Sequence, residues 1–429
     1  MKVSIPRLIS ILCATSASSA SRRLKSRPAR STAETQRAQR LRRDKLRTYR
    51  FIGRVAMFIT CLSAILVMST NQRAQSTPSL KDVFKSDFMI GAALNRRQFS
   101  EEDTRALPII KSQFNTISPE NQLKWQSIHP QPDKYDFDGA DRYVAFGEKY
   151  GMFVIGHTLV WHNQTPAWVF DDGKGNLVDR DTLLKRMRDH IRTVVGRYKG
   201  RIKGWDVVNE AVNADGTLRQ SKWLKIIGED YIAKAFQYAH EADPQAELYY
   251  NDYSLEELQK LNGAVRLIKN LKAQGVPISG VGLQGHNNLI FPSMQQQEAA
   301  ITAFAKLGVK VNITELDINV LPFVSEEEGP RIKLSDELQP KLNPYTSGLP
   351  KSVNEEQAMQ FAQLFRVYLK HRDVIDRITF WGVTDGDSWL NNFPVRGRTN
   401  YPLLFDREGK AKLSFDTLIA VGGSARRSD

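Results

Sequence analysis

Two glutamates are the strongest candidates for chemistry in this sequence, because each follows a short apolar run and has further polar residues beside it. Glu210 ends residues 202–210, and Glu315 lies near the end of residues 310–317. Cleavage of an acetal needs a proton for the departing oxygen and a negative charge near the developing oxocarbenium ion, and two carboxyl groups supply both. If the two groups lie about 5 to 5.5 Å apart, the second attacks carbon directly and the configuration is retained. We expect this separation, and with it a retaining mechanism.

The residues beside each glutamate suggest how the two roles are divided. His286, held in place by Asp317, can hydrogen-bond to a carboxylate and so keep Glu315 ionised as the nucleophile. Glu210 is then the proton donor and afterwards the base that activates water. Asn209 can bond to the sugar 2-hydroxyl, a contact that tightens in the transition state.

Polar residues recur at or just beyond the ends of the apolar runs. These positions are Glu120 with Asn121, His157, Asn209 with Glu210, Asn251 with Asp252, Gln284 with His286, Glu315 with Asp317, and Asp385. A structural hydrogen bond would explain one such residue well, but it explains the whole set poorly. Active sites of parallel barrels are built from the carboxyl ends of their strands. We therefore expect these side chains to converge on one rim.

The elements that must position these side chains alternate regularly from residue 88 onward. Strands are predicted at residues 88–93, 115–120, 153–158, 202–210, 247–252, 280–286, 310–317 and 377–384. Helical periodicity separates them, as in residues 230–243, where apolar residues share one face and Asp243-Pro244 ends the helix. Eight alternations in about 345 residues favour an α/β fold, a (β/α)8 TIM barrel that forms a single catalytic domain over residues 79–424. A doubly wound sheet would usually carry a Gly-rich nucleotide fingerprint, and the sequence has none.

The charge of the chain is concentrated at its N-terminus. The whole chain has 61 Lys and Arg against 47 Asp and Glu, but the first 77 residues hold 16 basic and 2 acidic residues, which leaves 45 of each for the remainder. A nucleic-acid binder needs a basic folded surface, so this balance argues against DNA or RNA as a partner.

The two cysteines, Cys13 and Cys61, also lie in the N-terminal part. The remainder of the chain therefore has no thiol for catalysis, for a disulfide or for a zinc-thiolate site. The sequence shows no metal-ligand cluster beyond the candidate site residues, and the two-carboxylate chemistry needs no cofactor.

The N-terminal region predicts a targeting segment. Residues 1–54 are read as a basic, largely disordered leader, residues 55–70 as a hydrophobic signal-peptide or signal-anchor segment, and residues 71–78 as a linker. Sixteen uncharged residues would span about 24 Å as a helix, short of a hydrocarbon core of roughly 30 Å. Membrane association is thus expected through residues 55–70 only, where Arg54 could extend an anchor by snorkelling.

Two other interpretations of the leader remain open. Lys2 and Arg7 precede a short apolar run, and Ser18-Ser19-Ala20 resembles a cleavage site, so the first twenty residues could be the signal. Both signal interpretations predict export of the domain, to the periplasm, to the extracellular space or to an outward-facing membrane anchor. A mistaken start codon or an unprocessed leader would instead have no targeting role.

The ordered motifs resemble a known family. Trp205-Asp206-Val207-Val208-Asn209-Glu210 and Ile313-Thr314-Glu315-Leu316-Asp317 resemble the acid/base and nucleophile signatures of glycoside hydrolase family 10 xylanases. The family's other strand ends are matched by Ser118 to Trp125, Gly156 to His162, Tyr250 to Tyr253, Gln284 to His286, and Phe380 to Asp385. The resemblance runs from about Ser79 to Leu418, and so many motifs in this order make it specific.

The resemblance implies an endo-1,4-β-xylanase, with xylan and xylo-oligosaccharides as partners. It also implies that the sugars on the non-reducing side are bound by Glu120, Asn121, Lys124, His157 and Trp161, with Trp381 and Trp389 closing over them. Gln284 and His286 complete the expected binding set, and Tyr253 is expected to stack on the leaving-group side. These types suit sugars, because aromatic rings stack on the apolar faces of pyranoses while Glu, Asn and Lys bond to hydroxyls. We expect a monomer.

One segment departs from the family pattern. Residues 321–352, after the nucleophile strand, are long and polar and include Glu326-Glu327-Glu328 and several prolines. Loops of this length are often functional or mobile. We expect this one to shape the leaving-group subsites and not the chemistry.

Two alternative functions remain. A β-1,4-glucanase or an enzyme of mixed action differs only in accepting the exocyclic hydroxymethyl of a six-carbon sugar, and pocket shape at Trp381 and Trp389 would decide this. A catalytically silent carbohydrate-binding protein is disfavoured, because both carboxylates and their supporting residues are present.

Overall fold

A computed structural model describes residues 37–38, 40–43, 78–325 and 328–425. The chain divides into two compact units, residues 1–76 and 77–429. The predicted leader, signal segment and linker lie almost entirely outside the described residues, so those assignments stay predictions. Among the residues that are described, no helix is both long enough and apolar enough to cross a membrane.

The second unit is built around a closed parallel barrel, as predicted. Its strands are β1 (Met89–Leu94), β2 (Thr116–Pro119), β3 (Phe153–Trp161), β4 (Gly204–Asn209), β5 (Glu247–Asp252), β6 (Gly280–Leu283), β8 (Lys310–Asn319) and β9 (Ile375–Phe380). Each strand pairs in parallel with its neighbour, and the pairings β1 with β9 and β6 with β8 close the ring. The eight-stranded barrel is therefore confirmed.

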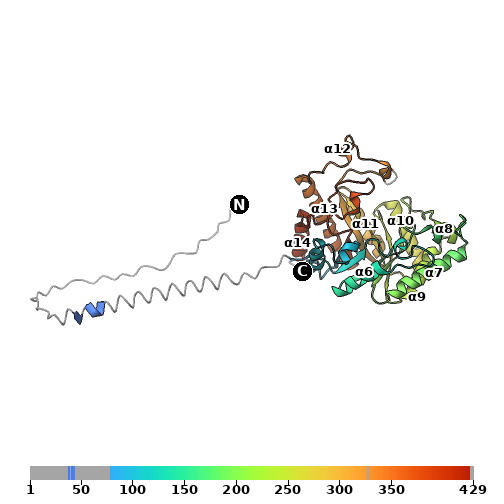
Figure 1. The fold of residues 1–429 in the computed structure, drawn as a ribbon, viewed down its shortest axis with the longest axis horizontal. Helices are drawn as coiled ribbons and strands as arrows, with labels where there is room; N and C mark the ends of the chain where they lie inside the picture. Colours follow the sequence, from blue (N-terminus) through green and yellow to red (C-terminus); the bar gives the residue numbers. More distant parts are fainter. Residues whose placement is uncertain (1–36, 39, 44–77, 326–327, 426–429) are drawn as a thin grey trace, which may run out of the picture. The chain divides into compact units, whose positions relative to one another are not determined.

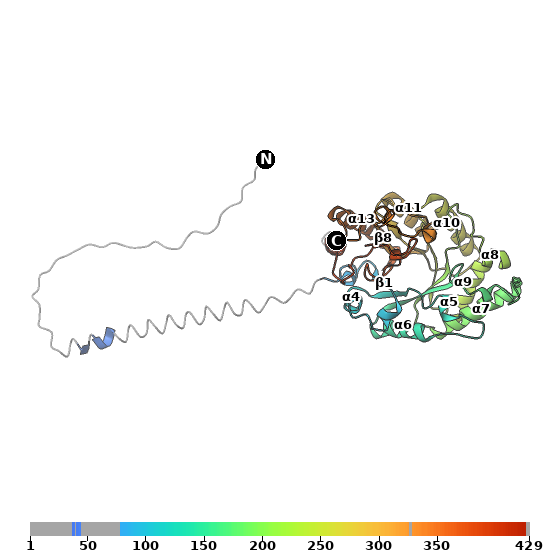
Figure 2. The same cartoon turned by 45° about the horizontal axis from the view of Figure 1, so that its top comes forward.

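Helices surround this barrel, as the views of Figure 1 and Figure 2 show. The longer helices are α4 (Ala106–Gln113), α6 (Asp138–Lys149), α7 (Arg180–Arg197), α9 (Tyr231–Ala242), α10 (Leu258–Ala273), α11 (Met294–Ala305), α13 (Lys351–Lys370) and α14 (Leu413–Ala425). Short turns of helix are α2 (Leu80–Val83), α3 (Arg96–Phe99), α5 (Trp125–Ile128), α8 (Lys222–Ile227) and α12 (Gln339–Leu342), with 3-10 turns η1 (Ala167–Val169), η2 (Gly329–Arg331) and η3 (Trp389–Asn391).

Local sequence explains where these helices begin and which face they bury. On α9 the predicted apolar residues Ile232, Ala235, Phe236 and Ala239 are all buried. The N-cap Asp179 of α7 accepts a hydrogen bond from the main chain of Thr182.

The structure differs from the expected strands at one place that matters for the site. Residues 280–286 were expected to form one strand, but the chain turns at Gly285, whose φ is +76°. Such a conformation favours glycine, so β6 ends at Leu283 and the short strand β7 (His286–Asn288) pairs with the outer part of β8. The break places His286 beside Asp317 on the outer part of β8.

A tight contact joins the neighbouring strands β3 and β4. A Cβ at Gly156 would lie 2.1 Å from a ring carbon of the fully buried Trp205. The glycine in the predicted motif therefore makes room for the large indole on the neighbouring strand.

The long segment 321–352 is attached to the chain that follows η3. Arg398 donates to the carbonyl of Pro322 at 3.2 Å, Asn343 accepts from the main chain of Thr399 at 2.7 Å, and the Tyr401 hydroxyl donates to the carbonyl of Tyr345 at 2.8 Å. The described part of the segment is therefore anchored to residues 398–401.

Candidate active site

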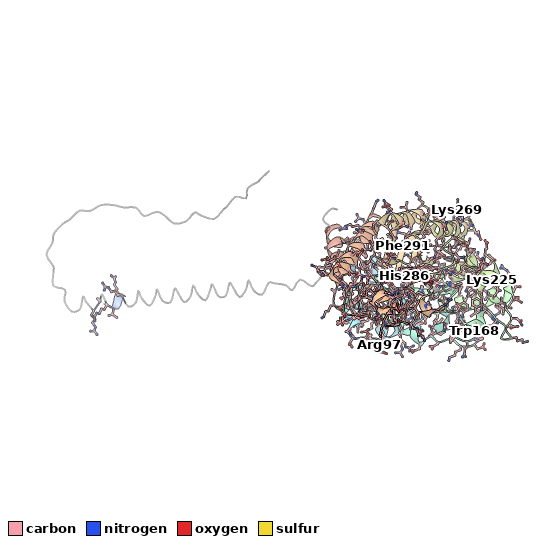
Figure 3. All side chains as sticks on the ribbon, turned by 90° about the horizontal axis from the view of Figure 1, so that it is seen from above. Arg97, Trp168, Lys225, Lys269, His286 and Phe291 are labelled. Carbon is pink, nitrogen blue, oxygen red and sulfur yellow. The ribbon has the colours of Figure 1, made fainter. Side chains whose placement is uncertain are left out.

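The two predicted catalytic glutamates lie on the same rim of the barrel. Glu210 directly follows β4, while Glu315 lies within β8, just past the last pair that β8 makes with β6, Leu283 with Ile313. Because all strands of a parallel barrel point the same way, these strand ends share one face. Figure 3 shows His286, the residue expected to support Glu315, toward the middle of the domain.

The carboxyl group of Glu210 accepts three hydrogen bonds. Trp161 Nε1 donates to Oε2 at 2.9 Å, and Oε1 accepts from Gln284 Nε2 at 3.0 Å and from Asn209 Nδ2 at 3.2 Å. Burial raises the pKa of Glu210, and the negative charge of Asp252 adds to this, which outweighs the opposing hydrogen bonds from Gln284 and Trp161. The environment therefore favours the protonated form.

Glu315 has the opposite environment. Its Oε1 accepts from Asn251 Nδ2 at 2.8 Å, and its Oε2 lies 3.1 Å from His286 Nε2. Burial by itself would raise the pKa of Glu315, but the hydrogen bond from His286 and nearby positive charge lower that pKa below its usual value. The carboxylate is therefore kept ionised although it is buried.

These opposite shifts separate two groups of the same chemical type into an acid and an anion. A protonated Glu210 can deliver a proton to a departing oxygen, and an ionised Glu315 can attack an adjacent electrophilic carbon. The pair therefore has the two opposite protonation states that an acid and a nucleophile need in a double displacement.

His286 is held between two carboxylates, as the sequence suggested. Its Nδ1 lies 3.1 Å from Asp317 Oδ2, opposite the contact with Glu315. Burial would lower the pKa of His286, but Asp317 and Glu315 together raise it to about 10, so the ring is an imidazolium at neutral pH. Trp389 Nε1 also donates to Asp317 Oδ2, at 2.9 Å, which ties a predicted sugar-binding residue to the support of the nucleophile.

Asn251 connects the two halves of the site. Its Nδ2 is within hydrogen-bonding distance of both Glu315 Oε1 and Asn209 Oδ1, at 2.8 and 2.9 Å. Its Oδ1 accepts from the Thr314 hydroxyl at 2.6 Å, and a Cβ at Gly282 would lie 2.2 Å from this same oxygen. The glycine on β6 thus leaves the space that the asparagine side chain occupies.

A polar group that includes four residues predicted to contact sugars lies beside Glu210. Lys124 Nζ donates to Asn121 Oδ1 at 3.0 Å and lies 5.1 Å from the ring centre of Trp161. Burial lowers the pKa of Lys124, while the charges of Glu315, Glu120 and Glu210 oppose that change. Burial raises the pKa of Glu120, and Lys124 opposes it. The ammonium is therefore the shared counter-charge of this region.

Trp381 contacts both His157 and His286. His157 Nδ1 lies 2.9 Å from Asp206 Oδ2, and the edge of Trp381 meets the His157 ring with centres 5.4 Å apart. Trp381 also lies 6.3 Å from the His286 ring. The imidazole is oriented by a buried carboxylate, which leaves Nε2 for other contacts.

Tyr253 reaches this network through a residue that the sequence did not indicate. Its hydroxyl accepts from Arg219 Nη2 at 2.9 Å, and Arg219 Nε donates to the main-chain carbonyl of Glu210 at 3.0 Å. Asn251 was also absent from the expected site, although it stood at a strand end among the polar positions. Arg219 gave no such signal, because it lies in a connecting loop.

Thus the structure brings the residues predicted to act on the substrate into one network of contacts on the rim, whereas Asp385, also expected there, pairs with Lys412 at 3.0 Å. The roles assigned to them individually remain predictions. Among the described residues, no group of three or more His, Cys, Asp or Glu side chains is placed to hold a metal ion.

Comparison with known proteins agrees with this site. An endo-1,4-beta-xylanase A from Xylanibacter ruminicola is 48% identical over 339 residues, which are 79% of this chain and 92% of that protein. A beta-1,4-xylanase from Dictyoglomus thermophilum is 42% identical over 372 residues, 86% of this chain and 98% of that protein.

Solved structures show the same similarity. A GH10 endoxylanase retrieved from a sugarcane soil metagenome is 46% identical with a TM-score of 0.76, over 81% of this chain and 100% of the other. A mutant structure in complex with xylotriose has a TM-score of 0.72 at 39% identity, over 80% and 99% of the two chains. The model of glycosyl hydrolase family 10 matches residues 79–421, which agrees with the range of the resemblance. This chain therefore belongs to glycosyl hydrolase family 10.

Proposed function

We propose that this chain is an endo-1,4-β-xylanase that hydrolyses internal β-1,4-xylosidic bonds with retention of configuration. Glu210 is the acid/base, and Glu315 is the nucleophile. The observation that carries this assignment is the opposite shift of the two pKa values, raised for Glu210 and lowered for Glu315. The xylanase activity named for relatives of 48% and 42% identity supports xylan as the polymer.

In the first step Glu315 forms a bond to the anomeric carbon while the glycosidic C–O bond breaks. The bonding electron pair stays with the departing oxygen, which takes the proton of Glu210. Glu210 then removes a proton from water, and the oxygen of that water replaces Glu315 on the anomeric carbon. Glu315 is thereby released and Glu210 is protonated again, so only the glycosidic bond and one water are consumed.

The sugars on the non-reducing side lie against the group beside Glu210. Lys124 and Asn121 form one polar edge, next to Glu120 and His157, and Trp161, Trp381 and Trp389 provide aromatic surfaces. Asn209 and Gln284 contact the sugar next to the cleaved bond, and Tyr253 stacks on the leaving-group side. The contacts of Lys124 with Asn121 and Trp161 support this grouping.

Replacement of each glutamate tests the mechanism. Glu315→Gln should lower the rate at least roughly 10⁴-fold even on an aryl xylobioside with a good leaving group, because no nucleophile remains. Glu210→Ala should lose roughly 10² to 10⁴-fold on xylan but much less on 2,4-dinitrophenyl xylobioside, which needs no proton. Added azide should restore turnover of Glu210→Ala and yield a β-xylobiosyl azide.

A matched control carboxylate is Glu148, which pairs with Arg201 at 2.7 Å near the opposite end of the barrel. Exposed pairs contribute little to stability, so Glu148→Gln should keep normal activity. Near-normal turnover by Glu315→Gln would overturn the mechanism.

A glucanase or an enzyme of mixed action is separated from a xylanase by catalytic efficiency on two substrates. The efficiency on aryl xylobioside should exceed that on aryl cellobioside, because an added hydroxymethyl must fit against Trp381 and Trp389. Trp389→Ala should lower the ratio of the efficiency on aryl xylobioside to that on aryl cellobioside. Equal efficiency in the unaltered protein would favour mixed action, and binding without turnover would indicate a carbohydrate-binding protein.

Export of the catalytic domain is part of the same proposal. It is supported by the basic residues 1–54, which are followed by the apolar residues 55–70. The segment 55–70 serves as a signal peptide or as an anchor that faces the domain outward. Mass measurement of the mature N-terminus tests cleavage, and fractionation of cells tests anchoring. The domain acts as a monomer, which sedimentation can test.

A further inference from the structure

The main chain at Glu210 has a conformation that residues with side chains rarely adopt. Its φ is +58°, in the left-handed region that normally favours glycine. A residue persists there only when its surroundings fix it, and such positions cluster at functional sites. The direction of the Glu210 carboxyl group depends on this backbone conformation, because the side chain leaves from the same Cα.

The peptide groups on both sides of Glu210 are held by hydrogen bonds. The Glu210 N–H donates to the carbonyl of Asn251 at 2.8 Å, and the following N–H, of Ala211, donates to the Tyr250 hydroxyl at 3.1 Å. The N–H of Val212 donates to Asp252 Oδ2 at 3.3 Å. Thus β5 holds the amide groups, while the carbonyl of Glu210 needs a donor from elsewhere.

Arg219 supplies that donor. Residues 212–218 form a tight hairpin in which Val212 and Leu218 pair and Gly216 has a φ of +81°, and Arg219 N then donates to the carbonyl of Ala211 at 2.8 Å. The hairpin returns the chain to the rim, so that Arg219 Nε reaches the carbonyl of Glu210 at 3.0 Å. The guanidinium thus bonds the main chain of Glu210, while the carboxyl oxygens of Glu210 accept from Trp161, Gln284 and Asn209.

The same guanidinium holds the tyrosine on the leaving-group side. Arg219 Nη2 donates to the Tyr253 hydroxyl at 2.9 Å, and one face of the Tyr253 ring lies against Lys260, whose Nζ is 3.3 Å from the ring centre. Lys260 is in turn paired at 2.8 Å with the fully buried Asp252. Tyr253 is therefore held at its hydroxyl and at one ring face, and the rigid guanidinium of Arg219 sets its position relative to Glu210.

We propose that Arg219 is a positioning residue for proton transfer, which fixes the carboxyl of Glu210 relative to the leaving-group oxygen by bonding the Glu210 carbonyl and the Tyr253 hydroxyl together. This inference rests on the proposed function, in which Glu210 is the acid/base. Arg219 does not exchange the proton. The proton passes from Glu210 to the glycosidic oxygen as the C–O bond breaks, and Arg219 sets the distance and angle of that transfer.

The test uses the dependence of catalytic efficiency on the leaving group, measured on the full chain. Arg219→Gln should lower kcat/KM on phenyl xylobioside roughly 10²-fold, because phenolate needs protonation. On 2,4-dinitrophenyl xylobioside the loss should stay within about threefold, because that departing group needs no proton. Arg219→Lys keeps the charge but lacks the planar guanidinium that bonds two acceptors at once. Its loss of kcat/KM on the phenyl substrate should therefore be intermediate.

Arg186 provides the matched control. It also bonds main-chain carbonyls, those of Val169 at 3.2 Å and Asp171 at 3.0 Å, but in the loop after β3. Arg186→Gln should show no dependence on the leaving group. Trapping of Glu315 with 2,4-dinitrophenyl 2-deoxy-2-fluoro-xylobioside measures the fraction of active molecules in each variant. Each kcat/KM is divided by this fraction, which corrects for partial misfolding.

Equal losses of Arg219→Gln on both aryl substrates, after this correction, would show a structural role and overturn the proposal, as would unchanged efficiency on both. Glu210→Ala is measured in parallel. If Glu210→Ala itself showed no dependence on the leaving group, the assignment of the acid/base would fail, and that result is distinct from a failure confined to Arg219.

Discussion

Asn251 donates its side-chain amide to Oε1 of Glu315 at 2.8 Å, from a strand adjacent to the one that leads to Glu210. The same nitrogen lies 2.9 Å from Asn209 Oδ1, and Asn209 in turn donates to Glu210 at 3.2 Å. Glu210 and Glu315, the proposed acid/base and nucleophile, are therefore joined by a chain of two asparagines. Any change in this chain affects groups whose protonation must remain opposite.

Replacement of Asn251 should raise the pKa of Glu315. Asn251→Ala removes a donor to the ionised form, and Asn251→Asp places a second negative charge at the same position, so the shift should be larger for aspartate. The acid limb of kcat/KM should move upward by about one pH unit for Asn251→Asp, with a loss of roughly 10 to 100-fold at neutral pH.

The pH profile on 2,4-dinitrophenyl xylobioside measures this shift, because that substrate does not need the proton of Glu210. Asn176, an exposed residue that bonds to Asp172, supplies the control Asn176→Asp. An acid limb of Asn251→Asp at the position of the unaltered protein would contradict the assigned contact.

Removal of the charge on His286 should also move the acid limb upward. The pKa of His286 is raised to about 10, so the imidazolium stabilises the ionised Glu315 throughout the neutral range. His286→Gln keeps a hydrogen-bond donor but removes the charge, so the pKa of Glu315 should rise. As the pH is lowered, activity should then be lost at a higher pH than in the unaltered protein. Asp317→Asn should act in the same direction but less strongly, because it only weakens the charge on His286.

The measurement is kcat/KM of both variants from pH 4 to 9 on the same dinitrophenyl substrate, with His240→Gln on α9 as the control. A downward shift of the acid limb in His286→Gln would exclude a positive charge on this ring.

Shortening the segment 321–352 should change the length of the released products more than the rate of bond cleavage. The described part of the segment is anchored to residues 398–401, and within that part no hydrogen bond or ion pair reaches Glu210 or Glu315. Replacement of residues 324–340 by a flexible Gly-Ser linker should therefore alter the xylo-oligosaccharides released from xylan while the rate on an aryl xylobioside stays within about twofold. Chromatography of the products and the aryl assay test this together, and equal losses in both would reject the assigned role.

The buried Glu256 should make stability fall as the pH rises. Burial raises its pKa to about 7 in the folded protein, from an ordinary value of 4.5. Between these values the folded state retains a proton that the unfolded state has lost, so the stabilising difference is complete below about pH 4.5 and is lost as the pH approaches 7. The change should be roughly 2 to 4 kcal/mol.

Urea unfolding at pH 5 and pH 8 measures the loss. Glu256→Gln is close in shape and cannot ionise, so it should reduce the difference between the two pH values. If the variant kept the full pH dependence, another group would be its source.

Much of the fold could be predicted because periodicity is local. The alternation of apolar runs with helical stretches indicated eight parallel strands, and β5 was placed at its observed bounds, 247–252. The polar strand ends indicated a common rim, because parallel strands end on one face. The break at Gly285 was missed, since a continuous polar and apolar pattern does not reveal where a glycine turns the chain.

The sequence by itself thus determined the barrel, the two glutamates and the pairing of His286 with Asp317, because strand direction and strand-end chemistry are enough to place them. Only the tertiary structure decided that Asn251 links the two carboxyls, that Trp389 bonds to Asp317, and that Arg219 holds the backbone of Glu210. These contacts join residues on different strands, or residues in loops with residues on strands. They depend on side-chain rotamers and loop paths that no local sequence pattern encodes.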